Sequence, residues 1–410
     1  MRAPFISIIQ YKVFNTSLVG KQLRRLLLLL CLQATTVHKS HAAPSLQIQS
    51  HGAKDSSCPV LPAGLLSIPK SYSVSKVEAP LIIDGRMDEA AWQKAAWTDE
   101  FRDIAGISKL PGVHIDRPEL ILPTQVKMLW DKDYLYIGAK LKDPHLWATL
   151  KQRDTIIYHN NDFEVFFTTS PDVSSYYELE INQRGTLLDL FMPKAYRNGG
   201  AALIHWDLHG IKSAVQLYGT LNNPTDQDSC WTVEMAIPFK GVLAFGQQKP
   251  RVGDYWRMNF SRVQWDLEKS PEGYKRKRKD GRLLPEHNWV WSAQGIVNMH
   301  APDRWGYLFF GDKDSQPPSL PHIEYQKAAL WRIYYLQYEA YKNNKSFAPS
   351  LKALGISDAK QVFKDLPIPA GALHLEMAAN KHWFRVALVD QVGKELLSLD
   401  QNGNLQTPKP

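Results

Sequence analysis

Short segments of alternating hydrophobic and polar residues, separated by turn residues, occupy the middle of the chain. Residues 125–130 and 134–141 flank Asp131, Lys132 and Asp133, a pattern typical of two β-strands joined by a tight turn. Further strands are predicted at residues 162–168, 176–182, 186–192, 213–220, 229–239, 255–265, 288–292 and 306–310. Because strong helical periodicity is almost absent from this region, the sequence predicts a mainly β fold, an antiparallel β-sandwich of the jelly-roll kind.

Helical periodicity is confined to a short segment before these strands and a long one after them. Residues 88–95 predict a short helix with acidic residues at its first turn. Beyond the prolines at 317, 318 and 321, residues 324–344 predict a long helix. Its buried face would consist of Leu330, Ile333, Tyr334, Gln337 and Tyr341.

The chain is expected to end in a small extension of this helix. Residues 350–355 would prolong the helix, and residues 383–389 and 395–399 would form a terminal hairpin. One helix and one hairpin bury little surface by themselves, so the extension is expected to pack on the sandwich. The predicted organisation is a signal peptide at 1–43, a leader or linker at 44–75, the sandwich at 76–312 and the C-terminal extension at 313–410.

The first 43 residues predict export to the periplasm, the cell envelope or the medium. They contain six Lys and Arg and no Asp or Glu, and Arg24-Arg25 precedes a short apolar core at residues 26–32. Ser40-His41-Ala42 supplies a small-x-small cleavage signal. The apolar core is too short to span a bilayer, so no integral membrane domain is expected, although an uncleaved, membrane-tethered form stays an alternative.

The charge and cysteine counts change once this segment is set aside. The whole chain carries a net charge of +8, but six of its basic residues lie in residues 1–43, which leaves +2. A nearly neutral exported chain argues against a nucleic-acid partner. Of three cysteines, Cys58 and Cys230 remain after cleavage, and they could form a disulfide or stay as two thiols.

Several characteristic motifs follow one another along the chain, at residues 83–92 (IDGRMDEAAW), 129–136 (LWDKDYLY), 161–167 (NDFEVFF), 176–186 (YYELEINQRGT), 231–238, 253–260 and 300–307. In this order they resemble the carbohydrate-binding module family 9-like sandwich. The resemblance covers roughly residues 76–311, and the extension is similar to that of exported members of the group.

This resemblance implies a non-catalytic module that binds a poly- or oligosaccharide between aromatic rings and serves a glycoside hydrolase or another envelope partner. It places Tyr158 in the ring position, Glu164 in the carboxylate position and Asn182 in a polar position of the site. Glu180 stands where the family carries an arginine, and Met299 stands where a second tryptophan is expected. Trp147 and Trp206, in loop-like segments, are candidates for the missing ring.

Three other functions stay open. Asp162 and Glu164, two apart on one strand, share a face and could serve glycoside hydrolysis, although polar strand faces often carry such pairs. A haem-binding relative would need methionine ligands such as Met128, Met192, Met258 or Met299, and packing explains these residues equally well. An envelope assembly protein could use the sandwich as a scaffold and the helix at 324–344 as a docking face.

Signals for metals and anions are weaker. A structural calcium would use loop carboxylates such as Asp131, Asp133 or Asp143. His205 and His209 lie four apart, but their strand context argues against a transition-metal site. Residues 275–279 (KRKRK) form the one strong charge block, interpreted as a solvated loop between strands, with an acidic glycan or an anionic surface as the alternative.

Overall fold

The computed structural model describes residues 61–106, 121–170, 172–243, 247–313, 316–369 and 371–407. The predicted signal peptide, most of the predicted leader and Cys58 lie outside these residues. No helix in the described ranges is long and apolar enough to cross a membrane.

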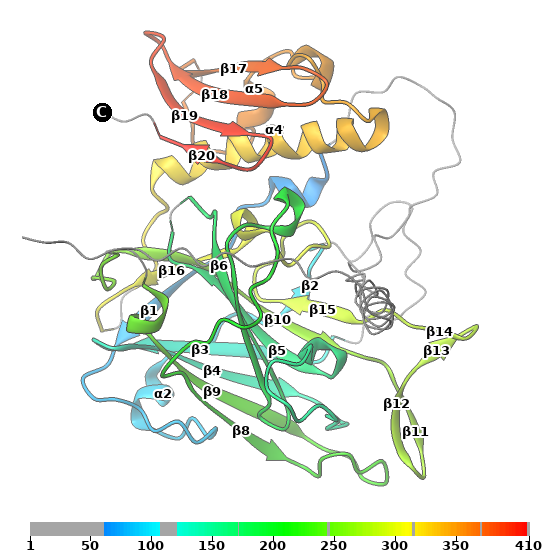
Figure 1. Cartoon of the computed structure of the whole chain (residues 1–410). Helices are drawn as coiled ribbons and strands as arrows, with labels where there is room; N and C mark the ends of the chain where they lie inside the picture. Colours follow the sequence, from blue (N-terminus) through cyan, green and yellow to red (C-terminus); the bar gives the residue numbers. More distant parts are fainter. Residues whose placement is uncertain are drawn as a thin grey trace, which may run out of the picture. The chain divides into compact units, whose positions relative to one another are not determined.

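The larger part of the fold is a two-layered β-sandwich (Figure 1). Its strands are β1 (Ser71–Lys76), β2 (Arg102–Asp103), β3 (Thr124–Trp130), β4 (Tyr134–Lys142), β5 (Asp162–Thr168), β6 (Tyr176–Asn182), β7 (Leu187–Met192), β8 (Lys212–Tyr218), β9 (Cys230–Pro238), β10 (Tyr255–Gln264), β15 (His287–Val290) and β16 (Gly306–Phe310). Short helical turns connect them: η1 (Ala63–Leu66), α2 (Ala90–Lys94), η2 (Ile157–His159), η3 (Tyr196–Asn198), α3 (Phe239–Val242) and η4 (Pro302–Arg304). The predicted mainly β sandwich and almost every predicted strand are confirmed.

Strand β1 joins the two layers. One layer runs β7-β6-β5-β10-β16, with β15 beside β10 and β2 beside β15, and the other runs β3-β4-β9-β8. β1 pairs with β16 through residues 71–74 and with β3 through residues 75–76, in both cases parallel. Strand β1 is thus a parallel strand in an otherwise antiparallel sandwich, and it brings residues 71–75 of the predicted leader into the sheet.

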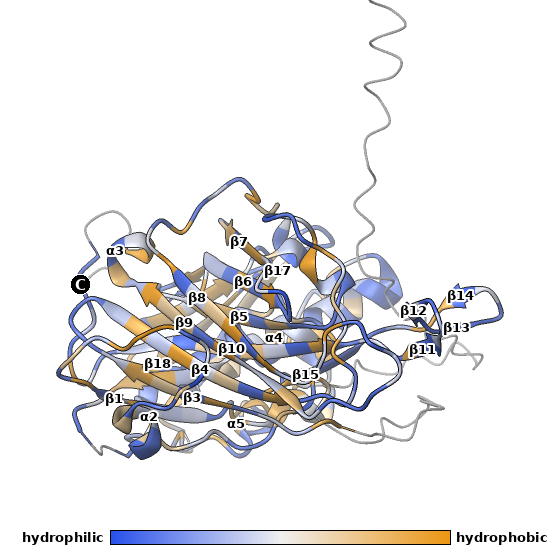
Figure 2. Cartoon of the chain, turned by 90° about the horizontal axis from the view of Figure 1, so that it is seen from below, coloured by the Kyte–Doolittle hydropathy of each residue, from blue (hydrophilic) through white to orange (hydrophobic). Residues whose placement is uncertain are grey.

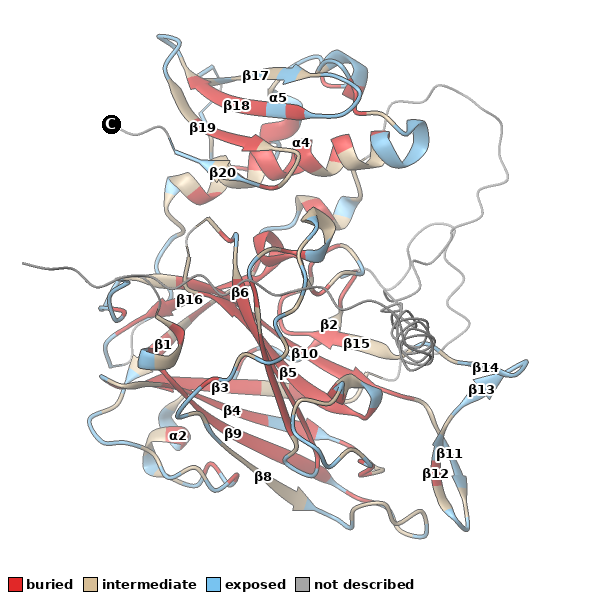
Figure 3. Cartoon of the chain, viewed as in Figure 1, coloured by how far each residue is buried: buried red, intermediate tan, exposed pale blue. Residues whose placement is uncertain are grey.

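The main hydrophobic core lies between the layers, where Figure 3 shows the strands buried over most of their length. Strand alternation sends Phe163, Val165 and Phe167 of β5 into this core, together with residues of β3, β4, β9, β10 and β16. The intervening residues of β5 point to the other side of the same layer, where Phe166 packs with Tyr176 and Trp305 in a second cluster. That outer face carries the site described below.

The motif at residues 83–92, which precedes β2, is held in place by one buried carboxylate. Glu234 of β9 accepts hydrogen bonds from the indole Nε1 of Trp92 at 2.7 Å and from the backbone N–H of Gly85 at 2.7 Å. It also accepts the backbone N–H groups of Asp84 and Arg86. Gly85 has a φ of 90°, and a Cβ there would lie 2.8 Å from the backbone nitrogen of Gln216, which explains the glycine. This motif thus fastens the chain to β9.

The C-terminal extension is a helix packed on a four-stranded antiparallel sheet. Its elements are α4 (His322–Asn344), η5 (Lys352–Leu354), α5 (Lys360–Phe363), β17 (Leu373–Ala379), β18 (Phe384–Asp390), β19 (Glu395–Asp400) and β20 (Leu405–Gln406). The predicted hairpin is the centre of this sheet, and β17 and β20 add a strand at each edge. The predicted prolongation of the helix is wrong, because α4 ends at Asn344 with Lys345 in the left-handed region and η5 is separate.

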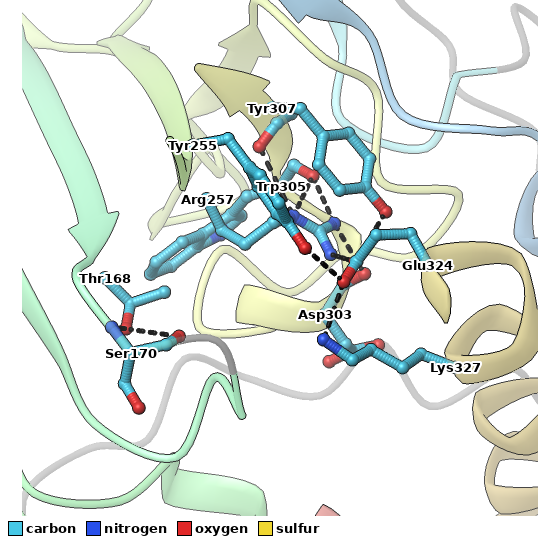
Figure 4. Close-up of polar contacts among 10 residues, drawn as sticks. Thr168, Ser170, Tyr255, Arg257, Asp303, Trp305, Tyr307, Glu324 and Lys327 are labelled. Atoms are coloured by element: carbon cyan, nitrogen blue, oxygen red, sulfur yellow. Dashed lines mark hydrogen bonds and ion pairs between the residues drawn. The ribbon is translucent and has the colours of Figure 1, made fainter. Parts of the chain in front are cut away.

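Helix α4 contacts the sandwich through a buried polar network centred on Glu324 (Figure 4). The carboxylate of Glu324 accepts hydrogen bonds from the hydroxyls of Tyr255 at 2.8 Å and Tyr307 at 3.1 Å. Arg257 Nη1 lies 3.5 Å and Lys327 Nζ 2.6 Å from it. The expectation that the extension packs on the sandwich is confirmed by these contacts.

The basic block at residues 275–279 is not a simple loop. It lies in two small hairpins, β11 (Leu267–Ser270) with β12 (Gly273–Arg276) and β13 (Arg278–Lys279) with β14 (Arg282–Leu283). These hairpins project from the sandwich, and in Figure 2 much of their length is hydrophilic. Most of their side chains are exposed, so the prediction of a solvated segment holds although its secondary structure was missed.

Candidate functional site

Four carboxylates lie together on the outer face of β5 and β6. Antiparallel pairing sets Glu164 opposite Glu180, while Asp162 is opposite Asn182 and Glu178 is opposite Phe166. Asp162, Glu164, Glu178 and Glu180, here named the carboxylate cluster, are 0, 5, 4 and 4 % exposed. In the described part of the chain no Lys or Arg forms an ion pair with any of the four, and only His300 Nδ1 approaches, 3.8 Å from Glu178 Oε2.

Burial without cationic partners raises the pKa values of these groups. Desolvation and then the neighbouring carboxylates hold the pKa values of Asp162, Glu164 and Glu178 well above their ordinary ranges. Burial raises the pKa of Glu180 to about 7, opposed by hydrogen bonds to its carboxylate, including one from the Tyr158 backbone. The cluster is therefore an electrostatically unfavourable arrangement, of the kind that proteins keep at functional positions.

Tyr158 stands at one side of the carboxylate cluster. It lies in η2 just before β5, and its backbone N–H donates to Glu180 Oε2 at 2.9 Å. The indole Nε1 of Trp265 donates to the Tyr158 carbonyl at 2.8 Å and fixes the turn. The ring is half-buried, and burial followed by the charges of Glu286, Glu180 and Glu164 raises the pKa of its hydroxyl.

Tyr196 is a second partly exposed ring at the cluster, and sequence reasoning missed it. It lies in η3, after β7, and is 46 % exposed. Its ring meets that of His300 edge to face, with centroids 4.6 Å apart. Burial of its hydroxyl, then the charges of Glu178 and Glu180, raise the pKa of Tyr196 to about 12. An aromatic residue in the loop that follows a strand of the same layer was the available signal.

The loop that carries Tyr196 is fastened to the C-terminal extension. Arg197 forms a buried ion pair with Asp303 and donates to the Tyr335 hydroxyl at 2.6 Å. Its guanidinium also lies over the ring of Trp331, 5.1 Å from the centroid. The neighbouring Asn198 accepts a hydrogen bond from the Tyr334 hydroxyl at 2.5 Å. Helix α4 thus holds both residues that follow Tyr196.

Of the residues predicted for the site, the fold brings Tyr158 and Glu164 together and gives the other three different surroundings. Trp147 is 6 % exposed and belongs to the hydrophobic cluster against which Tyr158 packs. Asn182 is fully buried. Its Oδ1 accepts hydrogen bonds from the backbone N–H groups of Arg184 and Thr186, and its Nδ2 donates to the Leu150 carbonyl. Asn182 therefore stabilises the turn after β6.

Trp206 lies on the other side of the layer. Its ring packs against Tyr177 at 5.0 Å, and Tyr177 belongs to the core between the layers, opposite in strand alternation to Glu178 and Glu180. Met299, expected near the second ring position, is 9 % exposed and its sulfur accepts a hydrogen bond from Gln294. Trp206 is therefore not placed to supply a ring at the carboxylate cluster.

The loop carboxylates predicted for calcium have protein partners. Asp131 accepts the backbone N–H groups of Asp133 and Tyr134 and the hydroxyl of Tyr136. Asp133 pairs with Lys249, and buried Asp143 lies 3.3 Å from Arg262. Among the described residues, the group gathered with metal-ligand spacing is Asp162, Glu164 and Glu180.

Methionine and cysteine side chains of the sandwich are packed. Met128, Met192 and Met258 are fully buried, which agrees with a packing role. Cys230 is 7 % exposed and makes no disulfide among the described residues, while its proposed partner Cys58 lies outside them.

A cavity of about 20 Å³ lies between α4 and the sandwich, lined by Arg257, Tyr307, Glu324 and Trp331 among others. Such a volume holds about one water molecule, so it cannot accept a sugar ring.

Comparison with known protein families finds a match that covers the candidate site. Residues 83–273 match the model of the carbohydrate family 9 binding domain-like family. This part of the chain is therefore similar to that family. This region contains both tyrosines and the whole carboxylate cluster, whereas His300 and the C-terminal extension lie beyond it. No curated protein sequence matches the chain.

Solved structures that are similar to this chain include those of two carbohydrate-related proteins. A candidate carbohydrate-binding protein from Bacteroides uniformis is 17 % identical over 59 % of this chain and 100 % of its own, with a TM-score of 0.43. A family 9 module from Caldicellulosiruptor kristjanssonii, solved with cellotriose and with glucose, is 16 % identical over 62 % and 61 % of this chain and all of its own, with TM-scores of 0.37.

Proposed function

We propose that this protein binds carbohydrate without catalysis, at the carboxylate cluster between Tyr158 and Tyr196. The observation that carries the proposal is that these two partly exposed rings lie at the same buried carboxylates, inside the family 9-like region. Sugar rings stack their C–H faces on aromatic rings, while their hydroxyls need fixed polar partners. Glu164, which stands in the carboxylate position of the family pattern and is 5 % exposed, is the carboxylate that we assign to hydroxyl binding.

Isothermal titration calorimetry with glucose and cellotriose, and then with other oligosaccharides, tests this function. We expect Tyr158→Ala and Tyr196→Ala each to weaken binding by at least about tenfold, because each loses one stacking face. Tyr218→Ala is the matched control, since Tyr218 on β8 is 45 % exposed and belongs to the other layer.

Two results would contradict the proposal. One is the absence of binding to any saccharide tested, and the other is an equal loss of affinity in Tyr158→Ala and Tyr218→Ala. Release of shorter sugars from a bound oligosaccharide would instead indicate hydrolysis by the carboxylates.

We also propose that the chain is exported and serves glycan breakdown together with a glycoside hydrolase or another envelope partner. The basic segment and apolar core within residues 1–43 support export. N-terminal sequencing of the protein recovered from fractionated cells tests this, with a mature start near residue 43 or 44 expected. Recovery of the intact chain in the cytosolic fraction would contradict it.

A further inference from the structure

We infer that Asp162, Glu164 and Glu180 bind a divalent cation of the calcium type on the outer face of β5 and β6. One carboxylate oxygen from each residue can be chosen so that all three lie within 4.8 Å of one another. Calcium is held by oxygens at about 2.3–2.6 Å, so two oxygens that share one ion lie at most about 5 Å apart. The separation in the structure meets this limit without rearrangement of the strands.

Unpartnered buried oxygens give the second, independent reason. Asp162 is fully buried, and neither of its carboxylate oxygens makes a full hydrogen bond among the described residues, although the backbone of Val263 lies close enough to favour the charged form. Glu178 Oε2, beside the three proposed ligands, is also buried without a hydrogen bond, and His300 Nδ1 lies 3.8 Å from it. A buried carboxylate without hydrogen bonds is costly whether or not it carries a proton, because a protonated oxygen also needs an acceptor. A bound cation would give these buried oxygens the favourable partner that they lack.

The ligand chemistry selects the type of ion. All three groups are carboxylates, which suit hard cations, and the triad contains no imidazole or thiolate of the kind that zinc and other transition metals prefer. Calcium accepts six to eight oxygens in a flexible arrangement, whereas magnesium requires near-octahedral geometry and retains waters. Three converging carboxylates from two neighbouring strands, all nearly inaccessible to water, suit calcium better.

The inference goes beyond the proposed sugar binding and can fail separately from it. Glu164 is shared, but Asp162 is not among the proposed sugar contacts and Tyr158 is not among the proposed ligands. Tyr158→Ala should therefore lose sugar affinity and keep cation binding. Asp162→Asn should lose cation binding, whatever happens to the sugar.

The experiment uses the whole protein, stripped with EDTA and passed through a desalting column. Thermal unfolding is recorded without metal, with CaCl₂ and with MgCl₂, and Tb³⁺ luminescence sensitised by neighbouring tyrosine and tryptophan reports binding directly. We expect 1 mM calcium to raise the melting temperature by at least about 4 °C. Magnesium should give a smaller shift, and calcium should displace terbium.

Asp162→Asn should abolish both signals, and Glu180→Gln is the second variant because its amide oxygen can still accept the Tyr158 N–H. Glu376→Gln, an exposed carboxylate on β17, is the control that should keep them. The inference is overturned if calcium gives neither a shift nor terbium displacement, if magnesium is preferred, or if both variants keep the wild-type response.

Discussion

Replacing Glu324 with glutamine is expected to lower the free energy of unfolding by about 3 kcal/mol at pH 7. Glu324 is 3 % exposed and its carboxylate is the only anion that Arg257 pairs with among the described residues. Glutamine keeps one acceptor for the tyrosine hydroxyls but leaves the buried guanidinium without an opposite charge. Loss of one partner from a buried ion pair is far more costly than loss of an exposed one.

The effect should depend on pH in a defined direction. Burial alone would raise the pKa of Glu324, but Arg257 and Lys327 outweigh it and lower the pKa below the ordinary value. A carboxyl whose pKa is lower in the folded state contributes stability above its unfolded pKa of about 4.3 and loses it as the pH falls through the folded value. The difference between wild type and variant should therefore be full at pH 7 and shrink below about pH 4.

Urea unfolding at several pH values measures both features. Glu339→Gln is the matched control, because it lies on the same helix in an exposed pair with Lys342 and should change stability by less than about 0.5 kcal/mol. A pH-independent loss, or equal losses in the two variants, would show that the Glu324 ion pair does not hold the helix to the sandwich.

The strands of the sandwich could be predicted because one face of each carries the core. Alternation in residues 162–168 and 176–182 gave β5 and β6 with their bounds, and the same periodicity located the long helix α4. Strand β1 was missed because its six residues, SYSVSK, are mostly polar and follow a leader-like segment. Its parallel pairing with β16 and β3 joins segments far apart in sequence, and no local pattern encodes such a register.

The candidate site was predictable only in part, for a related reason. Tyr158 and Glu164 belong to one short stretch of chain, so their spacing could be compared with a family pattern. Glu164 clusters with Glu180 and Glu178 because β5 pairs with β6. Sequence alternation alone predicts only that the two acidic residues of each strand lie on a solvent-exposed face. Tyr196 depends on how a loop folds back over the layer, and that path is set by contacts with α4 from the far end of the chain.

Replacing Arg197 with alanine is expected to lower stability by about 3 kcal/mol and to weaken sugar binding by about tenfold. The side chain of its partner Asp303 is fully inaccessible, so removal of the guanidinium leaves a buried carboxylate without a cationic partner among the described residues, and it keeps the hydrogen bond from the Tyr335 hydroxyl. The same change removes the contact over Trp331. The loop then loses one of its two anchors to α4, and Tyr196 loses its fixed position at the carboxylate cluster.

Calorimetry and urea unfolding of five variants separate positioning from general damage. Asp303→Asn added to Arg197→Ala removes the unpaired charge and should recover much of the stability without restoring sugar affinity. Arg197→Ala added to Tyr196→Ala should weaken binding no further than Tyr196→Ala alone, because Arg197 acts through that ring. Arg385→Ala, in an exposed pair with Glu395 on the C-terminal sheet, is the control and should change neither quantity appreciably. Wild-type sugar affinity in Arg197→Ala would show that the C-terminal extension does not position the site.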